Sequence, residues 1–109
     1  MTKAKDVGAY KHERTQIINL LQRIQDFTNN FDENRDISLI KARHTVAIGA
    51  LKEFCDVQSC IEQGAANAIE LEEEANKRVD FENMYYDTVA AIESLLRRHN
   101  ANTEKVVPQ

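Results

Sequence analysis

The sequence predicts an all-α protein, with three long helices in an elongated antiparallel bundle or a coiled-coil hairpin. Apolar residues recur every three or four positions along most of the 109 residues, which is the spacing of one face of an α-helix. The only proline is Pro108, and the three glycines are widely separated. The chain is 29% charged and only 6% aromatic, which is typical of amphipathic helices rather than of a β-sandwich.

The first helix is expected from about Tyr10 to Phe31. Its apolar residues follow i, i+3, i+4, i+7 spacing and are Ile17, Leu20, Leu21, Ile24, Phe27 and Phe31. Residues 32–36 form a polar connection after it, and residues 1–9 are expected to be a flexible arm before it.

The second helix is expected from about Ile37 to Gln63. Asp36 or Ser38 can cap its first turn, and Gly64 is a suitable stop because glycine accepts the left-handed conformation that ends helices. Its apolar stripe is wide, which predicts contact with two neighbours, and comprises Ile40, Ala47, Leu51, Phe54, Val57 and Ile61, with Val46, Ile48 and Ala50 beside them. Gly49 costs about 0.5–1 kcal/mol inside a helix, and a close helix crossing would explain it.

The third helix is expected from about Ala66 to Asn100, which makes residues 10–100 one helical domain and 101–109 a flexible tail. Its apolar stripe comprises Leu71, Ala75, Val79, Tyr85, Val89, Ile92 and Leu96, with Phe81, Met84 and Leu95 alongside. Glu74 with Arg78, and Arg78 with Glu82, are expected to form i, i+4 ion pairs on its surface.

The side chains that could carry chemistry lack the spacing that enzymes and metal sites use. The acidic run at Glu70, Glu72, Glu73 and Glu74 is expected to be a solvated helix face, because no Glu-x-x-His element accompanies it as in metal-binding bundles. Cys55, Cys60 and His44 do not match zinc spacing, and we expect structural thiols and a semi-buried, hydrogen-bonded histidine. No glycine-rich elbow or phosphate loop is present. We therefore expect no enzymatic activity, no metal and no cofactor.

Charge and cysteine content set the expected surroundings. The net charge of −4 argues against a nucleic-acid-binding domain. The basic residues near the two ends of the chain are either solvated or form a weak surface patch that binds phosphate groups or a membrane surface: Lys3, Lys5, Lys11, Arg14, Arg97, Arg98 and Lys105. The beginning of the sequence lacks the apolar segment of a secretory signal, and no apolar run is long enough to span a membrane. Cys55 and Cys60 point about 140° apart on a helix. Two free thiols fit a reducing compartment, and a cytoplasmic protein is expected.

Two linked signatures supply the candidate protein-contact residues. The first is Leu51-x-x-Phe54-x-x-Val57-Gln58-x-x-Ile61-Glu62, and the second is Arg78-x-x-Phe81-Glu82-x-x-Tyr85-Tyr86. Because adjacent helical residues are about 100° apart, Tyr86 points to the flank if Tyr85 faces the core. Tyr86 is then either an exposed interface anchor or a boundary residue. The candidate interface residues are Phe54, Val57, Phe81, Tyr85 and Tyr86.

The paired signatures, with Leu95-Leu96 after them, resemble the N-terminal Gag-like region of Bel/Pao-type LTR retrotransposons. The resemblance covers about Tyr10 to Asn100. It implies a non-enzymatic structural segment of a polyprotein that assembles into an intracellular particle through self-association or protein–protein contacts. The first helix is less basic here than in that family, which weakens any RNA or membrane role.

Other interpretations remain open at the level of sequence. A spectrin-like three-helix adaptor that binds another protein would show the same periodicity, and so would a weak RNA-binding accessory segment. The chain is also compatible with a fragment of a polyprotein or with a host gene derived from one.

Overall fold

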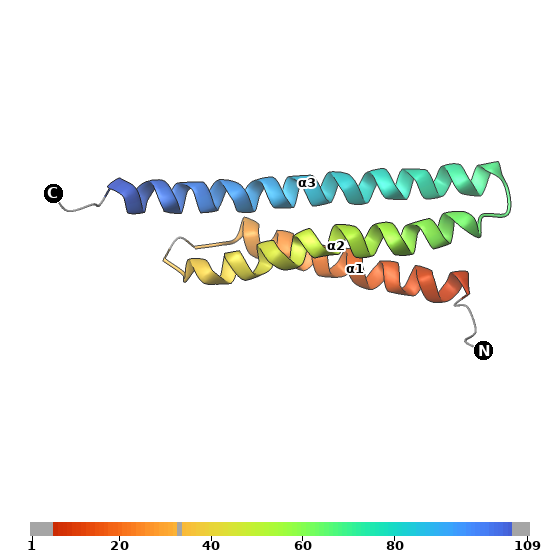
Figure 1. The fold of residues 1–109 in the computed structure, drawn as a ribbon, viewed down its shortest axis with the longest axis horizontal. Helices are drawn as coiled ribbons and strands as arrows, with labels where there is room; N and C mark the ends of the chain where they lie inside the picture. Colours follow the sequence, from red (N-terminus) through yellow and green to blue (C-terminus); the bar gives the residue numbers. More distant parts are fainter. Residues whose placement is uncertain (1–5, 33, 106–109) are drawn as a thin grey trace.

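The computed structural model describes residues 6–32 and 34–105, with side chains described as far as residue 101. The chain forms three helices, α1 (Val7–Asn29), α2 (Ile37–Gln63) and α3 (Ala68–Lys105). Helix α2 runs antiparallel to both α1 and α3, and the three helices lie along one common direction (Figure 1). All three pairs of helices pack against each other, so the fold is a closed, somewhat elongated three-helix bundle rather than an open hairpin.

The ends of α1 and α2 are set by aspartate caps. Helix α2 has the expected bounds, and Oδ1 of Asp36 accepts a hydrogen bond from the Ser38 backbone N–H at 2.9 Å. Helix α1 begins at Val7, three residues before the expected start at Tyr10, because Oδ1 of Asp6 caps the Ala9 N–H at 2.7 Å. Capping satisfies backbone N–H groups that have no partner within the helix. Residues 1–5 of the expected arm lie outside the described residues.

Helix α3 also has a side-chain cap, which explains one member of the acidic run. Oδ1 of Asn67 accepts from the Glu70 N–H at 2.9 Å, and Oε2 of Glu70 accepts from the Ala66 N–H at 2.8 Å. This reciprocal arrangement is close to a capping box. The helix continues to Lys105, five residues beyond the expected end, and projects past the ends of α1 and α2 (Figure 1). Residues 106–109 of the expected tail lie outside the described residues.

The apolar core draws on all three helices. Phe54 of α2 stacks on Phe81 of α3, with ring centroids 3.8 Å apart and planes 2° from parallel. The buried apolar residues are Ile17, Leu21, Ile24, Ile40, Ala47, Ala50, Phe54, Ile61, Phe81, Tyr85 and Ile92. Fully burying one large apolar side chain is worth about 1.5–3 kcal/mol, so this core is the main source of stability.

The predicted stripe of α3 is correct in its second half and wrong in its first. Tyr85 and Ile92 are buried, whereas Leu71 and Val79 are 48% and 53% exposed. The buried face instead passes through Glu74, Phe81, Tyr85, Thr88 and Ile92. Two polar residues occupy this face, and for that reason an apolar pattern does not locate it.

The wide stripe predicted for α2 is narrower in the structure. Ala50 is buried, but Val46 and Ile48 are both 46% exposed. Helix α2 does contact two neighbours, as expected. Val46 and Ile48 lie on opposite flanks of that contact surface, since they are two residues apart on a helix.

The two glycines of α2 differ from their predicted roles. Gly64 ends the helix but has φ −90°, which is not left-handed. A Cβ atom there would lie 2.6 Å from Cγ2 of Val7, so Gly64 makes room for the first turn of α1. Gly49 is not at a close crossing: among the described residues, nothing lies within 4 Å of a Cβ built at this position.

Candidate functional site

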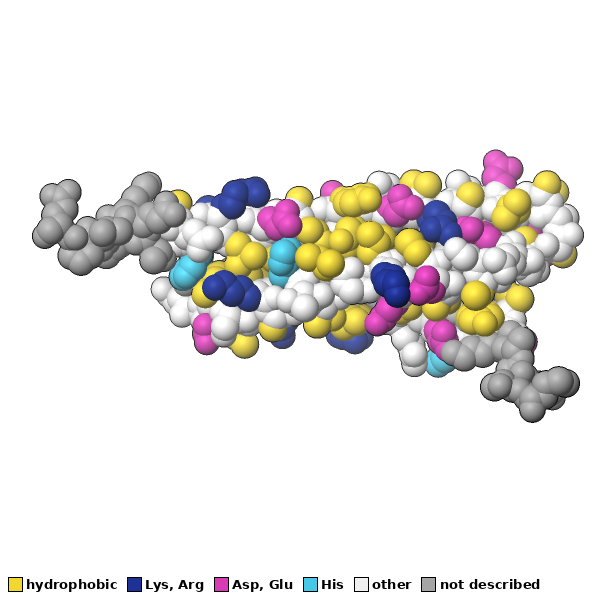
Figure 2. Space-filling view, in the orientation of Figure 1, with side chains coloured by type: hydrophobic (Ala, Val, Ile, Leu, Met, Phe, Trp, Pro, Cys, Tyr) yellow, Lys and Arg dark blue, Asp and Glu magenta, His cyan; other side chains and the backbone are white. Residues whose placement is uncertain are grey.

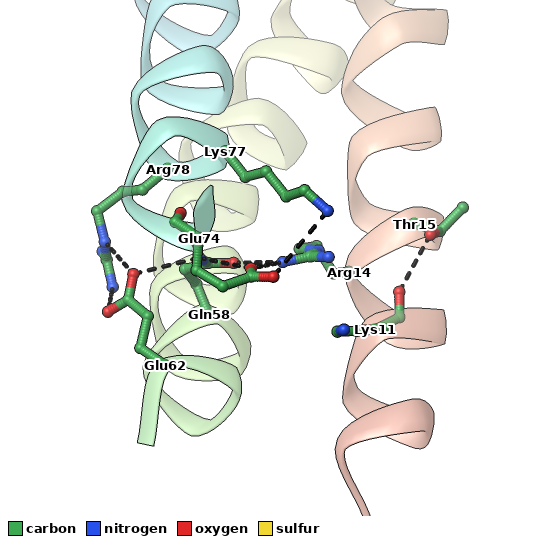
Figure 3. Close-up of polar contacts among 8 residues, drawn as sticks. All are labelled: Lys11, Arg14, Thr15, Gln58, Glu62, Glu74, Lys77 and Arg78. Atoms are coloured by element: carbon green, nitrogen blue, oxygen red, sulfur yellow. Dashed lines mark hydrogen bonds and ion pairs between the residues drawn. The ribbon is translucent and has the colours of Figure 1, made fainter. Parts of the chain in front are cut away.

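A polar cluster joins the three helices at the end of the bundle that holds the N-terminus of α1 (Figure 3). We define the polar cluster as Arg14 of α1, Gln58 and Glu62 of α2, and Glu74 and Arg78 of α3. Arg14, Gln58 and Glu74 are buried, and Glu62 and Arg78 are half-buried. The cluster replaces apolar packing at one level of the core.

Gln58 is the centre of this cluster. Arg14 forms an ion pair with Glu74, and Nη1 of Arg14 also donates to Oε1 of Gln58 at 3.0 Å. Nε2 of Gln58 donates to the Glu74 backbone carbonyl at 2.8 Å and to Oε2 of Glu62 at 3.2 Å. One amide side chain therefore connects α1, α2 and α3.

The outer part of the cluster is a bidentate pair between Arg78 and Glu62. Nε and Nη2 of Arg78 donate to the two carboxylate oxygens of Glu62 at 3.1 and 3.0 Å. Arg78 also approaches Ser59 Oγ at 3.5 Å and Cys55 Sγ at 3.7 Å. Bidentate arginine–carboxylate pairs are geometrically specific, so this pair fixes the register of α2 against α3.

The electrostatics of the cluster favour its charged form. Burial opposes ionisation of Glu74, but the hydrogen bond and charge of Arg14 outweigh it, and the pKa of Glu74 is lowered from its ordinary value of 4.5. The hydrogen bond from Arg78 lowers the pKa of Glu62. Hydrogen bonding to Glu62 in turn raises the pKa of Arg78. Both carboxylates are therefore ionised at neutral pH.

Several sequence predictions about these residues are wrong. Glu74 pairs with Arg14 rather than with Arg78, and Arg78 pairs with Glu62 rather than forming surface pairs within α3. Glu74 is buried, whereas the remaining members of the acidic run, including Glu70 at the helix cap, are exposed. Arg14 is also buried and does not belong to a basic surface at the chain ends. Lys3 and Lys5 of that predicted surface, and the side chain of Lys105, lie outside the described residues.

The sequence does contain a signal for the polar cluster, namely the positions of Arg14 and Glu74 relative to the apolar residues of their own helices. Arg14 lies three residues before Ile17 and seven before Leu21, and Glu74 lies seven residues before Phe81; each therefore shares a helix face with core residues. When each of two helices has a long charged residue on its apolar face, and the two charges are opposite, a buried ion pair between the helices is indicated. Sequence reasoning missed it because each helix was considered alone.

The polar cluster can fix how the three helices are aligned along the bundle, which is a structural role. Buried polar groups that are fully hydrogen-bonded favour one arrangement, because any shift in register leaves a charge or an amide unpaired at high cost. Within residues 6–32 and 34–105, no group of three or more His, Cys, Asp or Glu residues could hold a metal ion.

The remaining candidate side chains lie as the sequence analysis expected. His44 is half-buried, and its Nε2 lies 3.2 Å from Oε2 of Glu93. Cys55 and Cys60 are both half-buried free thiols.

The five candidate interface residues fall into three groups. Phe54, Phe81 and Tyr85 are buried inside the bundle, so most of their surface is already used within the chain. Val57 is half-buried in a groove between α1 and α2. Tyr86 is 58% exposed and makes an edge-to-face contact with Tyr85, with ring centroids 5.2 Å apart.

Tyr86 belongs to an exposed apolar surface over the junction of α2 and α3. Figure 2 shows hydrophobic side chains gathered there in the middle of one face. Its most exposed large members are Ile48, Val79 and Tyr86, and we call these three residues the α2/α3 strip.

Two side-chain contacts between α2 and α3 locate the strip on this junction. At one end Arg78 pairs with Glu62, and at the other His44 lies against Glu93. Ile48 follows His44 by four residues, and Tyr86 precedes Glu93 by seven, so helical periodicity places both on the same side as these pairs. Val79 precedes Tyr86 by seven residues and shares its side of α3.

The fold thus defines an all-α three-helix bundle with a polar cluster at one end and an apolar strip on one face. No protein-family model, curated protein or solved structure was found to match this chain. A search of the described residues finds no helix with both the length and the apolar character that crossing a membrane requires.

Proposed function

We propose that this chain is a non-enzymatic structural domain that assembles through protein–protein contacts, including contacts between copies of itself. The observation that carries this proposal is the α2/α3 strip. Its three large apolar side chains are between 46% and 58% exposed, although the chain has a separate core of buried apolar residues. Contiguous exposed apolar surface is characteristic of protein interaction sites.

Tyr86 is the residue of the strip best suited to contribute binding energy to such a contact. Tyrosine provides a large apolar surface with a polar tip and is enriched among the residues that dominate binding energy. Its edge-to-face contact with the buried Tyr85 restricts its position. A side chain that is already restricted loses less conformational entropy on binding.

The polar cluster supports this function by holding the strip in shape. Arg78 and Glu62 fix α2 against α3 at one end of the strip, so Ile48 on one helix keeps its place relative to Val79 and Tyr86 on the other. Binding surfaces built on rigid helices are more precise than surfaces built on loops.

The same proposal includes a retrotransposon Gag-like origin and an intracellular setting. The origin rests on the resemblance of the two signatures in sequence. In the structure these two signatures face each other, since Phe54 stacks on Phe81 and Glu62 pairs with Arg78. The setting is supported by the free thiols of Cys55 and Cys60.

Sedimentation velocity over a wide range of protein concentration tests the assembly proposal. The wild-type chain is expected to form species larger than the monomer, and the double substitution Val79→Ser/Tyr86→Ser is expected to weaken them at least tenfold. Ile69→Ser is the matched control, because Ile69 is the most exposed large apolar residue of α3 and lies off the strip. A wild-type chain that stays monomeric throughout, or equal effects of the strip and control variants, would overturn the proposal.

A further inference from the structure

A second surface, the groove between α1 and α2, has acidic residues at one end. This groove has a volume of about 540 Å³ and an apolar floor formed by Ile17, Leu20 and Val57. Glu13, Glu53 and Asp56 surround that floor. The exposed carboxylates of Glu53 and Asp56 repel each other, so a cationic partner would be favoured there.

The other end of the same α1/α2 face carries three arginines, Arg23, Arg35 and Arg43, and we call it the basic end. The guanidinium groups of Arg43 and Arg35 lie 3.6 and 5.6 Å from the centre of the Phe27 ring. Arg23 lies one turn before Phe27 on α1 and is exposed. Two carboxylates lie near these arginines in sequence, and both accept backbone N–H groups: Asp32 from Asn34 and Asp36 from Ser38.

Contacts within the bundle fix the distance between the two ends. Phe27 of α1 lies level with Arg43 of α2, and Arg43 precedes Glu53 by ten residues on α2, so the acidic and basic ends are separated by about ten helical residues. At 1.5 Å per residue, this is about 15 Å along the bundle. Val46, which is exposed, lies between them on α2.

Gly49 also lies between the two ends, three residues after Val46 and four before Glu53. It is exposed, and the described residues leave open space around it. A glycine in mid-helix costs about 0.5–1 kcal/mol relative to alanine, and no contact within the bundle explains that cost. Close approach of another backbone would use the absence of a side chain.

We propose that the α1/α2 face is an interface for a second copy of this chain, docked antiparallel about a two-fold axis near Gly49. In that arrangement the acidic end of each copy lies on the basic end of the other. A two-fold interface requires such self-complementarity, because the same surface is used on both partners. At about 1.5 Å per residue and about 10 Å per helix, about 20 residues of two adjacent helices form a face about 30 Å long and about 20 Å wide. Such a face covers about 600 Å² per copy, which is at the lower end for specific interfaces.

This interface is distinct from the α2/α3 strip, and each can fail without the other. An isologous contact on one face closes a dimer, whereas two self-associating faces on one chain extend the assembly. A structural assembly domain with both surfaces would form species larger than dimers, and one with the α1/α2 interface alone would form dimers.

Paired charge reversals test the proposal in the full chain that carries Val79→Ser/Tyr86→Ser, so that association through the strip does not contribute. One variant adds Glu53→Lys/Asp56→Lys, and the other adds Arg23→Glu/Arg35→Glu; all four side chains are exposed. We expect each variant alone to dimerise at least tenfold more weakly than the parent. An equimolar mixture should recover dimers, because the reversed ends of the two variants are complementary.

Glu72→Lys/Glu73→Lys is the matched control, since it makes the same charge change on exposed residues of α3. Gly49→Gln in the parent is a further variant, expected to weaken dimerisation at least tenfold while circular dichroism shows an unchanged helix content. A parent that remains monomeric at every concentration would overturn the proposal. So would charge variants that behave like the control, or a mixture that does not recover dimers.

Discussion

Replacing Arg14 with methionine should lower the free energy of unfolding by about 3 kcal/mol. Breaking a buried ion pair on one side costs about 3–5 kcal/mol, because the remaining charge stays buried without its partner. The side chains of Arg14 and Glu74 are only 7% and 9% exposed. We expect the lower end of that range, since Glu74 keeps a hydrogen bond from Gln58 at 3.3 Å and has Lys77 at 4.0 Å.

Urea unfolding followed by circular dichroism measures this loss, and a second substitution separates the charge from the packing. Arg14→Met/Glu74→Met removes both charges and keeps long apolar side chains, so it should recover at least about 2 kcal/mol of the loss. The two substitutions are then strongly non-additive, as expected for contacting residues. A loss below about 1 kcal/mol for Arg14→Met, or a double variant equal to the sum of the singles, would refute the buried ion pair.

Three further predictions concern stability under conditions in which the chain is monomeric. Oγ1 of Thr88 is buried without a hydrogen-bond partner among the described residues, so Thr88→Val should raise the free energy of unfolding by about 1 kcal/mol; a loss would indicate an unrecognised partner. Gly49→Ala should stabilise the chain by about 0.5–1 kcal/mol in thermal unfolding. Gly64→Ala should give no such gain, because its Cβ would lie 2.6 Å from a methyl group of another helix. Equal effects of the two substitutions would contradict this packing. The pKa values of Glu62 and Glu74 are lowered on folding. The contribution of these two carboxylates to the free energy of unfolding is therefore fully present above the unfolded pKa near 4.5 and is lost as the pH falls through the folded pKa values. Glu62→Gln should flatten this acid-dependent loss in a pH series of urea unfolding curves, and an unchanged pH profile would count against it.

Helical periodicity was sufficient to predict the number of helices and both ends of α2. The Asp36 cap was recognisable because a polar connection separates it from the preceding apolar stripe. Asp6 was not, since the residues after it include a glycine and few large apolar side chains. Helix ends depend on single side-chain hydrogen bonds, and such bonds are only weakly reflected in apolar periodicity.

The polar cluster could not be predicted from periodicity in one helix at a time. The burial of Glu74 depends on Arg14, which is sixty residues earlier in the chain and lies on another helix. An i, i+4 pattern favoured surface pairing of Glu74 with Arg78 instead. Tertiary contacts therefore decide the environment of a charged residue, and only the arrangement of all three helices shows which charges meet.

The candidate interface was predicted only in part for a related reason. Phe54 and Phe81 share the periodicity of core residues, and the structure shows that they stack on each other. Tyr86 is exposed because it lies one residue past the buried Tyr85, as the 100° step of a helix requires. The acidic and basic ends of the α1/α2 face come from separate helices, so they become apparent only when those helices are packed together.

Backbone amide chemical shifts recorded across a series of protein concentrations test the central claim most directly, because they report where copies of the chain meet. The account predicts concentration-dependent shifts at Ile48, Val79 and Tyr86 on the α2/α3 strip, with little change at Ile69. Spectra that do not change with concentration would contradict the claim that this bundle is an assembly domain. Shifts that avoid the strip would contradict the strip as the surface that carries the proposed assembly.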